Sequence, residues 1–244
     1  MNQLRRVLVA LRLGLRPPRL GLPVALIISA VLLGAVLTAP HQHARPRSSP
    51  GTELALLRTE LRTYVAVGDS ITAGMVQGTD RLDTPGPTSW LNGEVEPRLL
   101  RVGGWAMPGR VTGDMLANVS PTAADVLVLL GGTNDLARGV PWADTQAHLL
   151  EIVTTVGARE ALLVAIPPYD ADPAGRSAFN ARLAALAARL HWRFLDPWTS
   201  VAVDGAWVTG TSVDGIHPVP AVAAAVGQVI SGKAWKVVWR RTGP

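Results

Sequence analysis

Short apolar runs alternate with stretches of helical pattern between residues 60 and 232, and this alternation limits the possible folds more than any other feature. Continuous apolar runs are typical of strands that are buried on both faces of a sheet. Strands that alternate with helices favour a parallel sheet, because each crossover helix returns the chain to the same edge. The predicted strands lie at residues 64–67, 99–102, 125–130, 161–166 and 192–195.

Four segments between and after these runs have the composition and spacing of helices. Pro141 suits the first turn of a helix, and other segments place apolar side chains at helical spacing. The predicted helices cover residues 112–118, 141–156, 176–190 and 220–230. We therefore predict an α/β fold with a doubly wound, mainly parallel five-stranded sheet flanked by helices. Such sheets place their active sites at the carboxyl ends of the strands.

The positive charge of the chain is concentrated near its start. The 244 residues include 23 Lys and Arg against 18 Asp and Glu, which gives a formal net charge of +5. Seven Arg and no acidic residue lie within residues 1–47, so the remainder is slightly acidic. Because nucleic-acid binding relies on a basic surface, we expect no nucleic-acid partner. The absence of cysteine excludes disulfides, thiolate metal sites and a cysteine nucleophile.

Residues 20–39 contain no charged residue and are long enough, as a helix, to span a bilayer. Five Arg precede this run and two follow it, which predicts a cytoplasmic segment at residues 1–19 and an exported domain. A cleaved signal peptide is the alternative, but Leu37 is a poor residue at the −3 position of a cleavage site. We expect a single-pass transmembrane signal anchor in the cell membrane, or a secreted domain if the segment is cleaved.

Three further segments complete the predicted domain organisation. Residues 40–59 begin with a stretch rich in Pro, Ser and Arg, which is typical of a flexible tether. The folded domain is expected over residues 60–232. Residues 233–244 are predicted as a basic tail, and its Trp235 and Trp239 suit either contact with a membrane surface or packing on the core.

Ser70 follows a predicted strand and Gly68, and it precedes a predicted helix start. A serine hydroxyl in such a turn is exposed, and the first N–H groups of a helix can stabilise a developing anion. A serine that only caps a helix gives the same pattern. The segment by itself therefore leaves a nucleophile and a structural cap as alternatives.

Asp214 and His217 lie three residues apart in the segment Asp-Gly-Ile-His-Pro. A neutral histidine beside a serine can take its proton, and a carboxylate on the other ring nitrogen fixes the tautomer. A surface turn that contains Asp and Gly is the alternative interpretation. His148 and His191 lie in or near helical stretches without a well-placed acid, so we expect structural roles for both.

The strongest predicted strand is followed by Gly131-Gly132-Thr133-Asn134-Asp135. Glycines let a backbone turn sharply and approach a ligand, and the Asn134 amide is a donor suited to an oxyanion. A glycine-rich loop with an ordinary Asn turn is the alternative. The segment is not a phosphate-binding P-loop, because no Gly-Lys-Ser/Thr follows it.

In this order, the segments resemble the sequence blocks of the SGNH hydrolases, also called the GDSL esterase/lipase family. The resemblance covers roughly residues 60–230, with Ile71 where Leu is usual. The second block is degenerate, so either Gly109 or Gly104 can take the place of the oxyanion glycine. The four blocks match Gly68-Asp69-Ser70, Gly104-Trp105-Ala106-Met107-Pro108-Gly109, Gly132-Thr133-Asn134-Asp135 and Asp214-Gly215-Ile216-His217.

The resemblance implies a three-layer, flavodoxin-like arrangement and a role for each matched residue. Ser70 would be the nucleophile, His217 the general base and then acid, and Asp214 its orienting partner. The oxyanion hole would combine the backbone N–H groups of Ser70 and Gly109 with the side chain of Asn134. The implied chemistry is ester hydrolysis through an acyl-enzyme on Ser70, which needs no metal and no organic cofactor.

Three functions remain open from the sequence. The first is a membrane-tethered esterase or lipase whose substrate is a small-molecule, lipid or glycan ester. The others are an acyltransferase to a sugar or lipid hydroxyl, and a non-catalytic envelope-binding protein on the same fold. An ordinary α/β-hydrolase is disfavoured, because Thr72 replaces the last glycine of G-x-S-x-G. The sequence predicts no particular substrate-binding residue, acyl-chain length or oligomeric state.

Overall fold

The computed structural model of the chain describes residues 61–75, 82, 84–94 and 96–242. All of these residues belong to one compact unit, Leu54–Pro244. The predicted cytoplasmic segment, signal anchor and tether lie outside the described residues. Within the described part, no helix is both long enough and apolar enough to cross a membrane.

Five parallel strands form a single sheet in the order β2-β1-β3-β4-β5. This sheet confirms the predicted mainly parallel, five-stranded architecture. The chain passes from β1 to β2 on one side and then returns to β3 on the other side of β1. Doubly wound sheets bind ligands at such a reversal, outside the carboxyl ends of the strands. The strands are β1 (Arg62–Gly68), β2 (Leu99–Ala106), β3 (Val126–Leu130), β4 (Glu160–Val164) and β5 (Arg193–Leu195).

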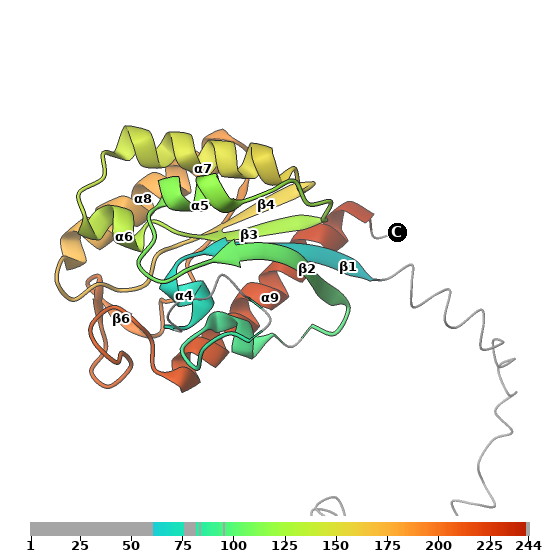
Figure 1. The fold of residues 1–244 in the computed structure, drawn as a ribbon. Helices are drawn as coiled ribbons and strands as arrows, with labels where there is room; N and C mark the ends of the chain where they lie inside the picture. Colours follow the sequence, from blue (N-terminus) through green and yellow to red (C-terminus); the bar gives the residue numbers. More distant parts are fainter. Residues whose placement is uncertain (1–60, 76–81, 83, 95, 243–244) are drawn as a thin grey trace, which may run out of the picture. The chain divides into compact units, whose positions relative to one another are not determined.

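Helices cover both faces of the sheet (Figure 1). One face carries α5, α7 and α8, and the opposite face carries α9. A short antiparallel pair, β6 (Ala202–Val203) and β7 (Ala206–Trp207), follows β5. The helices are α4 (Ser70–Ala73), the 3-10 helix η1 (Trp90–Gly93), α5 (Thr112–Asn118), α6 (Thr133–Ala137), α7 (Trp142–Val156), α8 (Pro173–Arg189) and α9 (Pro220–Thr242).

The alternation of side chains along β1 divides the apolar core into two layers. Tyr64 and Ala66 are buried in the cluster that contains the α9 residue Val226, whereas Val65 and Val67 are buried in the cluster under α5, α7 and α8. Successive side chains of a strand point to opposite faces, so a central strand must be apolar at every position. The continuous apolar runs of the sequence therefore follow from a sheet covered on both sides.

The last helix is longer than the sequence suggested. It was expected at residues 220–230, but α9 continues to Thr242, so most of the predicted tail lies in the helix. Ala234 and Val237 are buried in the core, which extends the apolar stripe of α9. Trp235 packs against the same core and stacks on Trp239, with ring centroids 5.5 Å apart. Packing on the sheet thus explains the helical conformation of this segment.

Strand β2 also runs beyond its predicted end, through Gly103 and Gly104 to Ala106. Gly104 has a φ of +136°, and a Cβ at this position would lie 1.9 Å from the carbonyl oxygen of Ala66 in β1. Only glycine permits this conformation together with so close an approach of two strands. Gly104, which resembles part of a strand end in the sequence, is therefore a point of close contact between β1 and β2.

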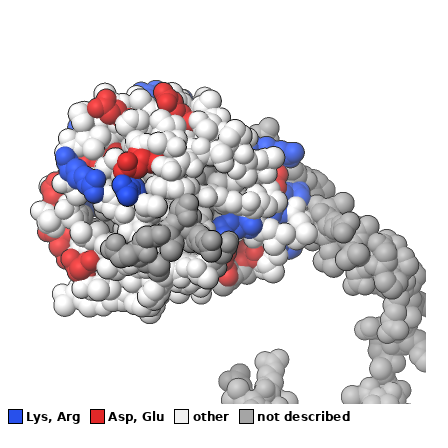
Figure 2. All heavy atoms as spheres, in the orientation of Figure 1, with Lys and Arg blue, Asp and Glu red and all other residues white. Residues whose placement is uncertain are grey.

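Charged side chains of both signs are interspersed over the face drawn in Figure 2. On the described atoms of this face, basic residues do not form one broad patch. Polar groups that could act chemically are instead gathered at the carboxyl edge of the sheet, where the loops after β1, β2 and β3 meet.

Candidate active site

Ser70 begins α4, and only Asp69 separates it from the end of β1 at Gly68. Asp69 caps this short helix, and its Oδ1 accepts the N–H of Ile71 at 3.0 Å. A Cβ at Gly68 would lie 2.2 Å from the hydroxyl oxygen of Thr72, closer than two such atoms can approach. Glycine before the turn therefore lets α4 fold back tightly on the strand, which leaves Ser70 at the carboxyl edge of the sheet.

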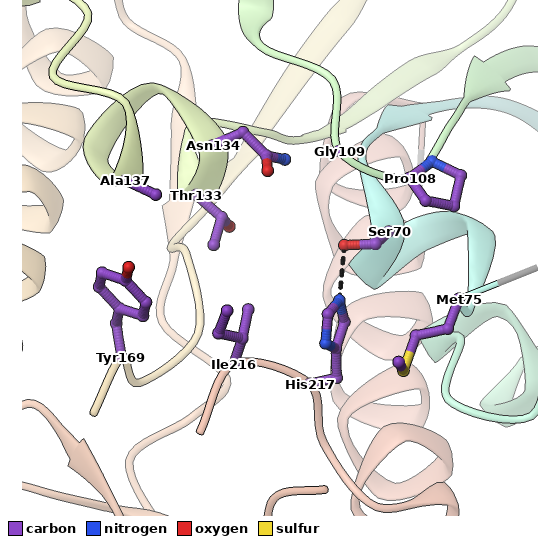
Figure 3. Close-up of a pocket in the computed structure, with 10 residues that line it drawn as sticks. All are labelled: Ser70, Met75, Pro108, Gly109, Thr133, Asn134, Ala137, Tyr169, Ile216 and His217. Atoms are coloured by element: carbon purple, nitrogen blue, oxygen red, sulfur yellow. Dashed lines mark hydrogen bonds between the residues drawn. The ribbon is translucent and has the colours of Figure 1, made fainter. Parts of the chain in front are cut away.

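Ser70 is hydrogen-bonded to His217, which lies 147 residues later in the sequence. The Nε2 atom of His217 is 2.8 Å from the Oγ of Ser70 (Figure 3). The other ring nitrogen, Nδ1, is 2.7 Å from Oδ2 of Asp214. The structure thus brings the three predicted residues into one chain of hydrogen bonds, in the order of a nucleophile, a base and an orienting carboxylate.

The segment that carries Asp214 and His217 is a tight turn held by its own side chains. Oδ1 of Asp214 accepts the backbone N–H groups of Ile216 and His217 at 3.0 and 2.8 Å. The Ser212 hydroxyl accepts the N–H of Gly215 at 2.9 Å and donates to the carbonyl oxygen of His217 at 2.8 Å. These contacts fix the backbone on both sides of the imidazole ring.

The pKa of Asp214 lies below its ordinary value. Partial burial acts to raise it, but hydrogen bonds from the backbone and ring of His217 and from the N–H of Ile216 outweigh that effect. Because each of these donors favours the charged form, Asp214 is a carboxylate at neutral pH. A carboxylate here stabilises the positive charge that His217 acquires when it takes a proton.

Asn134 and Gly109 line the same pocket as Ser70 (Figure 3). Asn134 Nδ2 donates one hydrogen to the carbonyl oxygen of Arg110 at 3.0 Å, and an amide nitrogen carries a second hydrogen. Arg138 Nη2 donates to the carbonyl oxygen of Gly109 at 2.6 Å. Of the two candidate oxyanion glycines, Gly109 lies at the pocket, whereas Gly104 lies within β2.

Asp135, next to Asn134, is fully buried and connects α6 to its neighbours. Its carboxylate accepts the backbone N–H of Thr112 at 3.0 Å and the hydroxyl groups of Thr112 and Thr145. Thr112 also lies 3.2 Å from Nδ1 of His148. Side chains in and directly after α6 therefore hold the segment that follows β2 at three points, Gly109, Arg110 and Thr112.

Asp69 is the second fully buried carboxyl group near the nucleophile. Burial raises its pKa to about 6, although the N–H of Ile71 and the nearby His217 act in the opposite direction. Among the described residues, its Oδ2 atom has no hydrogen-bond partner. Because Asp69 is also the helix cap that precedes Ser70, its ionisation is coupled to the stability of this turn.

The pocket beside Ser70 has a volume of about 260 Å³. Thr133, Asn134 and Ala137 contribute from α6, while other walls come from the loops at the carboxyl ends of the strands. Within the described part of the chain, His, Asp and Glu residues form no group of three or more that could hold a metal ion. The described polar groups that line the pocket are hydroxyl, imidazole, amide and backbone groups. The remaining lining residues are Ser70, Met75, Pro108, Gly109, Tyr169, Ile216 and His217.

The sequence of residues 66–225 matches a family model described as GDSL-like lipase/acylhydrolase. The chain belongs to this family. The match includes Ser70, Asn134, Asp214 and His217, and it supports an ester hydrolase as the general class of protein. None of the curated proteins in the comparison matches the chain.

Several solved structures share the fold, and two of them are described as GDSL-type proteins. A GDSL-like lipase from Bacteroides thetaiotaomicron is 20% identical, with a TM-score of 0.53, over 77% of this chain and 95% of that one. A member of the lipolytic G-D-S-L family from Veillonella parvula is 17% identical, with a TM-score of 0.53, over 72% and 97%. TesA is 23% identical, with a TM-score of 0.52, over 72% and 99%. At these identities the likeness establishes the fold.

Three residues near the site of this GDSL-family protein were not predicted from the sequence. Arg138 lies four residues after Asn134, one helical turn away, and this spacing alone could have placed both on one face. Ser212 precedes Asp214 by two residues, as a serine that stabilises a turn often does. Tyr169 follows β4 and two prolines, at the carboxyl edge where ligands bind.

Proposed function

We propose that the protein is a serine esterase that hydrolyses carboxylic esters through an acyl-enzyme on Ser70. The observation that carries this proposal is the hydrogen-bonded chain from Ser70 through His217 to Asp214. Membership of the GDSL-like lipase/acylhydrolase family supports the same class of reaction. The proposed mechanism has two halves, each with one proton transfer toward His217 and one away from it.

In the first half, the Oγ of Ser70 attacks the ester carbonyl carbon and its proton passes to Nε2 of His217. The carbonyl oxygen becomes an oxyanion, and Asp214 stabilises the imidazolium that forms. When the tetrahedral intermediate collapses, the bond to the alcohol oxygen breaks. His217 gives its proton to that oxygen, the alcohol leaves, and the acyl group stays on Ser70.

In the second half, water takes the place of the alcohol. His217 accepts a proton from the water as its oxygen attacks the acyl carbon. Collapse of the second intermediate breaks the bond to Ser70, returns the proton to Oγ and releases the carboxylic acid. All bonds are made and broken between substrate, water, Ser70 and His217.

The oxyanion would be held by the backbone N–H groups of Ser70 and Gly109 and by the second hydrogen of Asn134. Such donors act strongly because they are already oriented before charge develops, and losing one typically costs about 2.7–4 kcal/mol. The hydrogen bonds from Arg138 and Asn134 to the carbonyl groups of Gly109 and Arg110 support this assignment, because they orient the loop.

We further propose that the enzyme is exported and tethered to the membrane by residues 20–39. The uncharged run and the excess of Arg before it support this topology. A carbonate wash of membranes from cells that express the full chain tests it. The protein is expected in the membrane pellet, and a soluble product that starts near residue 40 would contradict the tether.

The test of the catalytic proposal compares the full chain, in detergent, with its Ser70→Ala variant on p-nitrophenyl acetate and butyrate. The wild-type rate is expected to exceed that of the variant by a factor of at least about 10³. Equal rates would reject Ser70 as the nucleophile. Adding an alcohol acceptor and analysing the products separates the two fates of the acyl group, because a dominant transfer product would indicate an acyltransferase.

A further inference from the structure

The pocket beside Ser70 is small for a ligand site. Its volume of about 260 Å³ lies below the range of roughly 300–1,000 Å³ that is usual for drug-sized ligands. The reacting ester group takes part of this volume, so the remaining space suits an acyl group of only a few carbons.

Tyr169 stands at one end of this pocket. Figure 3 shows Tyr169 and Ile216 on the side of His217 that faces away from Met75, with the Tyr169 hydroxyl directed toward Ala137. A group that is bound to Ser70 and extends between Ile216 and α6 therefore meets the aromatic ring. The ring is the largest side chain on that side of the pocket.

The backbone that carries Tyr169 is held by hydrogen bonds on both sides of the residue. Its N–H donates to the carbonyl oxygen of Gly205 at 3.0 Å, and its own carbonyl oxygen accepts the N–H of Asp172 at 3.2 Å. The preceding residues, Pro167 and Pro168, are buried, and each proline ring restricts φ. These contacts fix the backbone from which the Tyr169 ring extends at this end of the pocket.

The walls near Tyr169 favour an uncharged ligand. Ala137, Ile216 and the aromatic ring present mainly apolar surface, and none of the described residues that line the pocket is Lys, Arg, Asp or Glu. An acyl group with an ionised end would lose hydration there without meeting an opposite charge. Each methylene that becomes buried against apolar walls, in contrast, strengthens binding roughly fourfold.

We propose that this enzyme selects esters of short, uncharged acyl groups of about two to six carbons, and that Tyr169 sets the upper limit. The inference rests on the proposed esterase function and adds the substrate class to it. Within the limit, kcat/KM rises with each enclosed methylene. Beyond it, the chain meets the ring of Tyr169 and must leave the pocket, so kcat/KM falls.

The experiment measures kcat/KM of the full chain for p-nitrophenyl esters with acyl groups from two to twelve carbons. We expect a maximum at six carbons or fewer and a value at least about tenfold lower for the dodecanoyl ester. In Tyr169→Ala, the ratio of the dodecanoyl to the acetyl value is expected to rise at least tenfold. A wild-type profile that stays flat or keeps rising to twelve carbons would overturn the proposal.

Three controls keep the test specific. Tyr169→Phe removes only the hydroxyl and keeps the ring, so the acyl length at which kcat/KM is highest should match that of the wild type. Tyr169→Leu replaces the ring by a smaller apolar side chain. It should raise the ratio of the dodecanoyl to the acetyl value less than Tyr169→Ala does. If Tyr169→Ala unfolds, Tyr169→Leu takes its place in the test. Met75→Ala enlarges the other side of the pocket and should leave the position of the maximum unchanged. A shifted maximum in Met75→Ala, together with an unshifted one in Tyr169→Ala, would also overturn the proposal.

A second measurement separates this proposal from the proposed function. Alkylboronic acids of three to twelve carbons bond to a serine oxygen and require no turnover, and their binding is followed as a shift in Tm. The short members should stabilise wild type more than the long ones, and Tyr169→Ala should reduce that difference. Selective binding without any ester hydrolysis would contradict only the esterase function. Hydrolysis with equal binding of all lengths would contradict only the size limit.

Discussion

The Oδ2 atom of Asp214 lies 2.7 Å from Nδ1 of His217, three residues later in the same turn. Both side chains therefore form one hydrogen-bonded unit that the chain presents to Ser70. The second oxygen of Asp214 accepts two backbone N–H groups of this turn, so the carboxylate shapes the loop as well as the ring. Its removal affects both the orientation of the imidazole and the charge that supports it.

We predict that His217→Ala lowers kcat by a factor on the order of 10⁴ or more, because the general base is lost. The factor by which Asp214→Ala lowers kcat should be about tenfold smaller than the factor for His217→Ala, since Ser212 still holds the backbone of His217. Steady-state kinetics on p-nitrophenyl butyrate measures both values. An Asp214→Ala variant that is as active as wild type would show that the carboxylate does not support the base.

The two contacts that hold the oxyanion loop should have different effects. Asn134→Ala removes a proposed oxyanion donor and should lower kcat by about 10²–10³. Arg138→Ala removes only the hydrogen bond to the carbonyl group of Gly109, so a fall of about tenfold in kcat with little change in KM is expected. Arg138→Lys keeps a charged donor and should recover part of the loss.

Thermal unfolding of the same variants shows whether Arg138 positions Gly109 or only stabilises the fold. A loss of kcat with an unchanged Tm supports positioning of Gly109 by Arg138. If both kcat and Tm fall in Arg138→Ala, and neither recovers in Arg138→Lys, the residue has a purely structural role.

The burial of Asp69 should make the stability of the domain depend on pH. Its pKa is about 6 in the folded state against an ordinary value of 3.8, so between these values the folded state binds a proton that the unfolded state has released. The free energy of unfolding should therefore decrease as the pH rises from about 4 to about 6, by up to roughly 3 kcal/mol.

The variant Asp69→Asn isolates this contribution, because an amide can still cap α4 but does not ionise. Urea unfolding at several pH values gives the difference in stability between wild type and variant. That difference should shift in favour of the variant between pH 4 and pH 6. A difference that is constant with pH would show that Asp69 titrates alike in both states.

Two glycines in different surroundings should respond oppositely to alanine. In Gly104→Ala the new Cβ would meet the carbonyl oxygen of Ala66 at a φ that disfavours alanine, so the domain should lose about 3 kcal/mol of stability. Gly232 lies within α9 and a Cβ there meets nothing within 4 Å. Gly232→Ala should therefore stabilise the domain by about 0.5–1 kcal/mol. Urea midpoints measure both changes, and a destabilised Gly232→Ala would contradict the second.

Most of the sheet could be predicted because its signal is local. Continuous apolar runs at β3 and β4 can be buried on both faces in only a few ways, and the helices between them allow parallel crossovers. The ends of β2 and α9 were not predicted correctly, because they depend on contacts between segments that are distant in the sequence. Gly104 is required by the backbone of Ala66, and the last turns of α9 are stabilised by a core that forms only after folding.

The sequence alone determined the class of fold, the family and the residue types available for chemistry, because apolar periodicity, turn chemistry and short motifs lie within a few neighbouring positions. The tertiary structure decided which of these residues meet. Ser70 and His217 are 147 residues apart, and Arg138 contacts Gly109 across 29 residues. Such contacts depend on how strands and loops pack in space. The size of the pocket and the position of Tyr169 at its end depend on the same packing, so they emerge only from the folded chain.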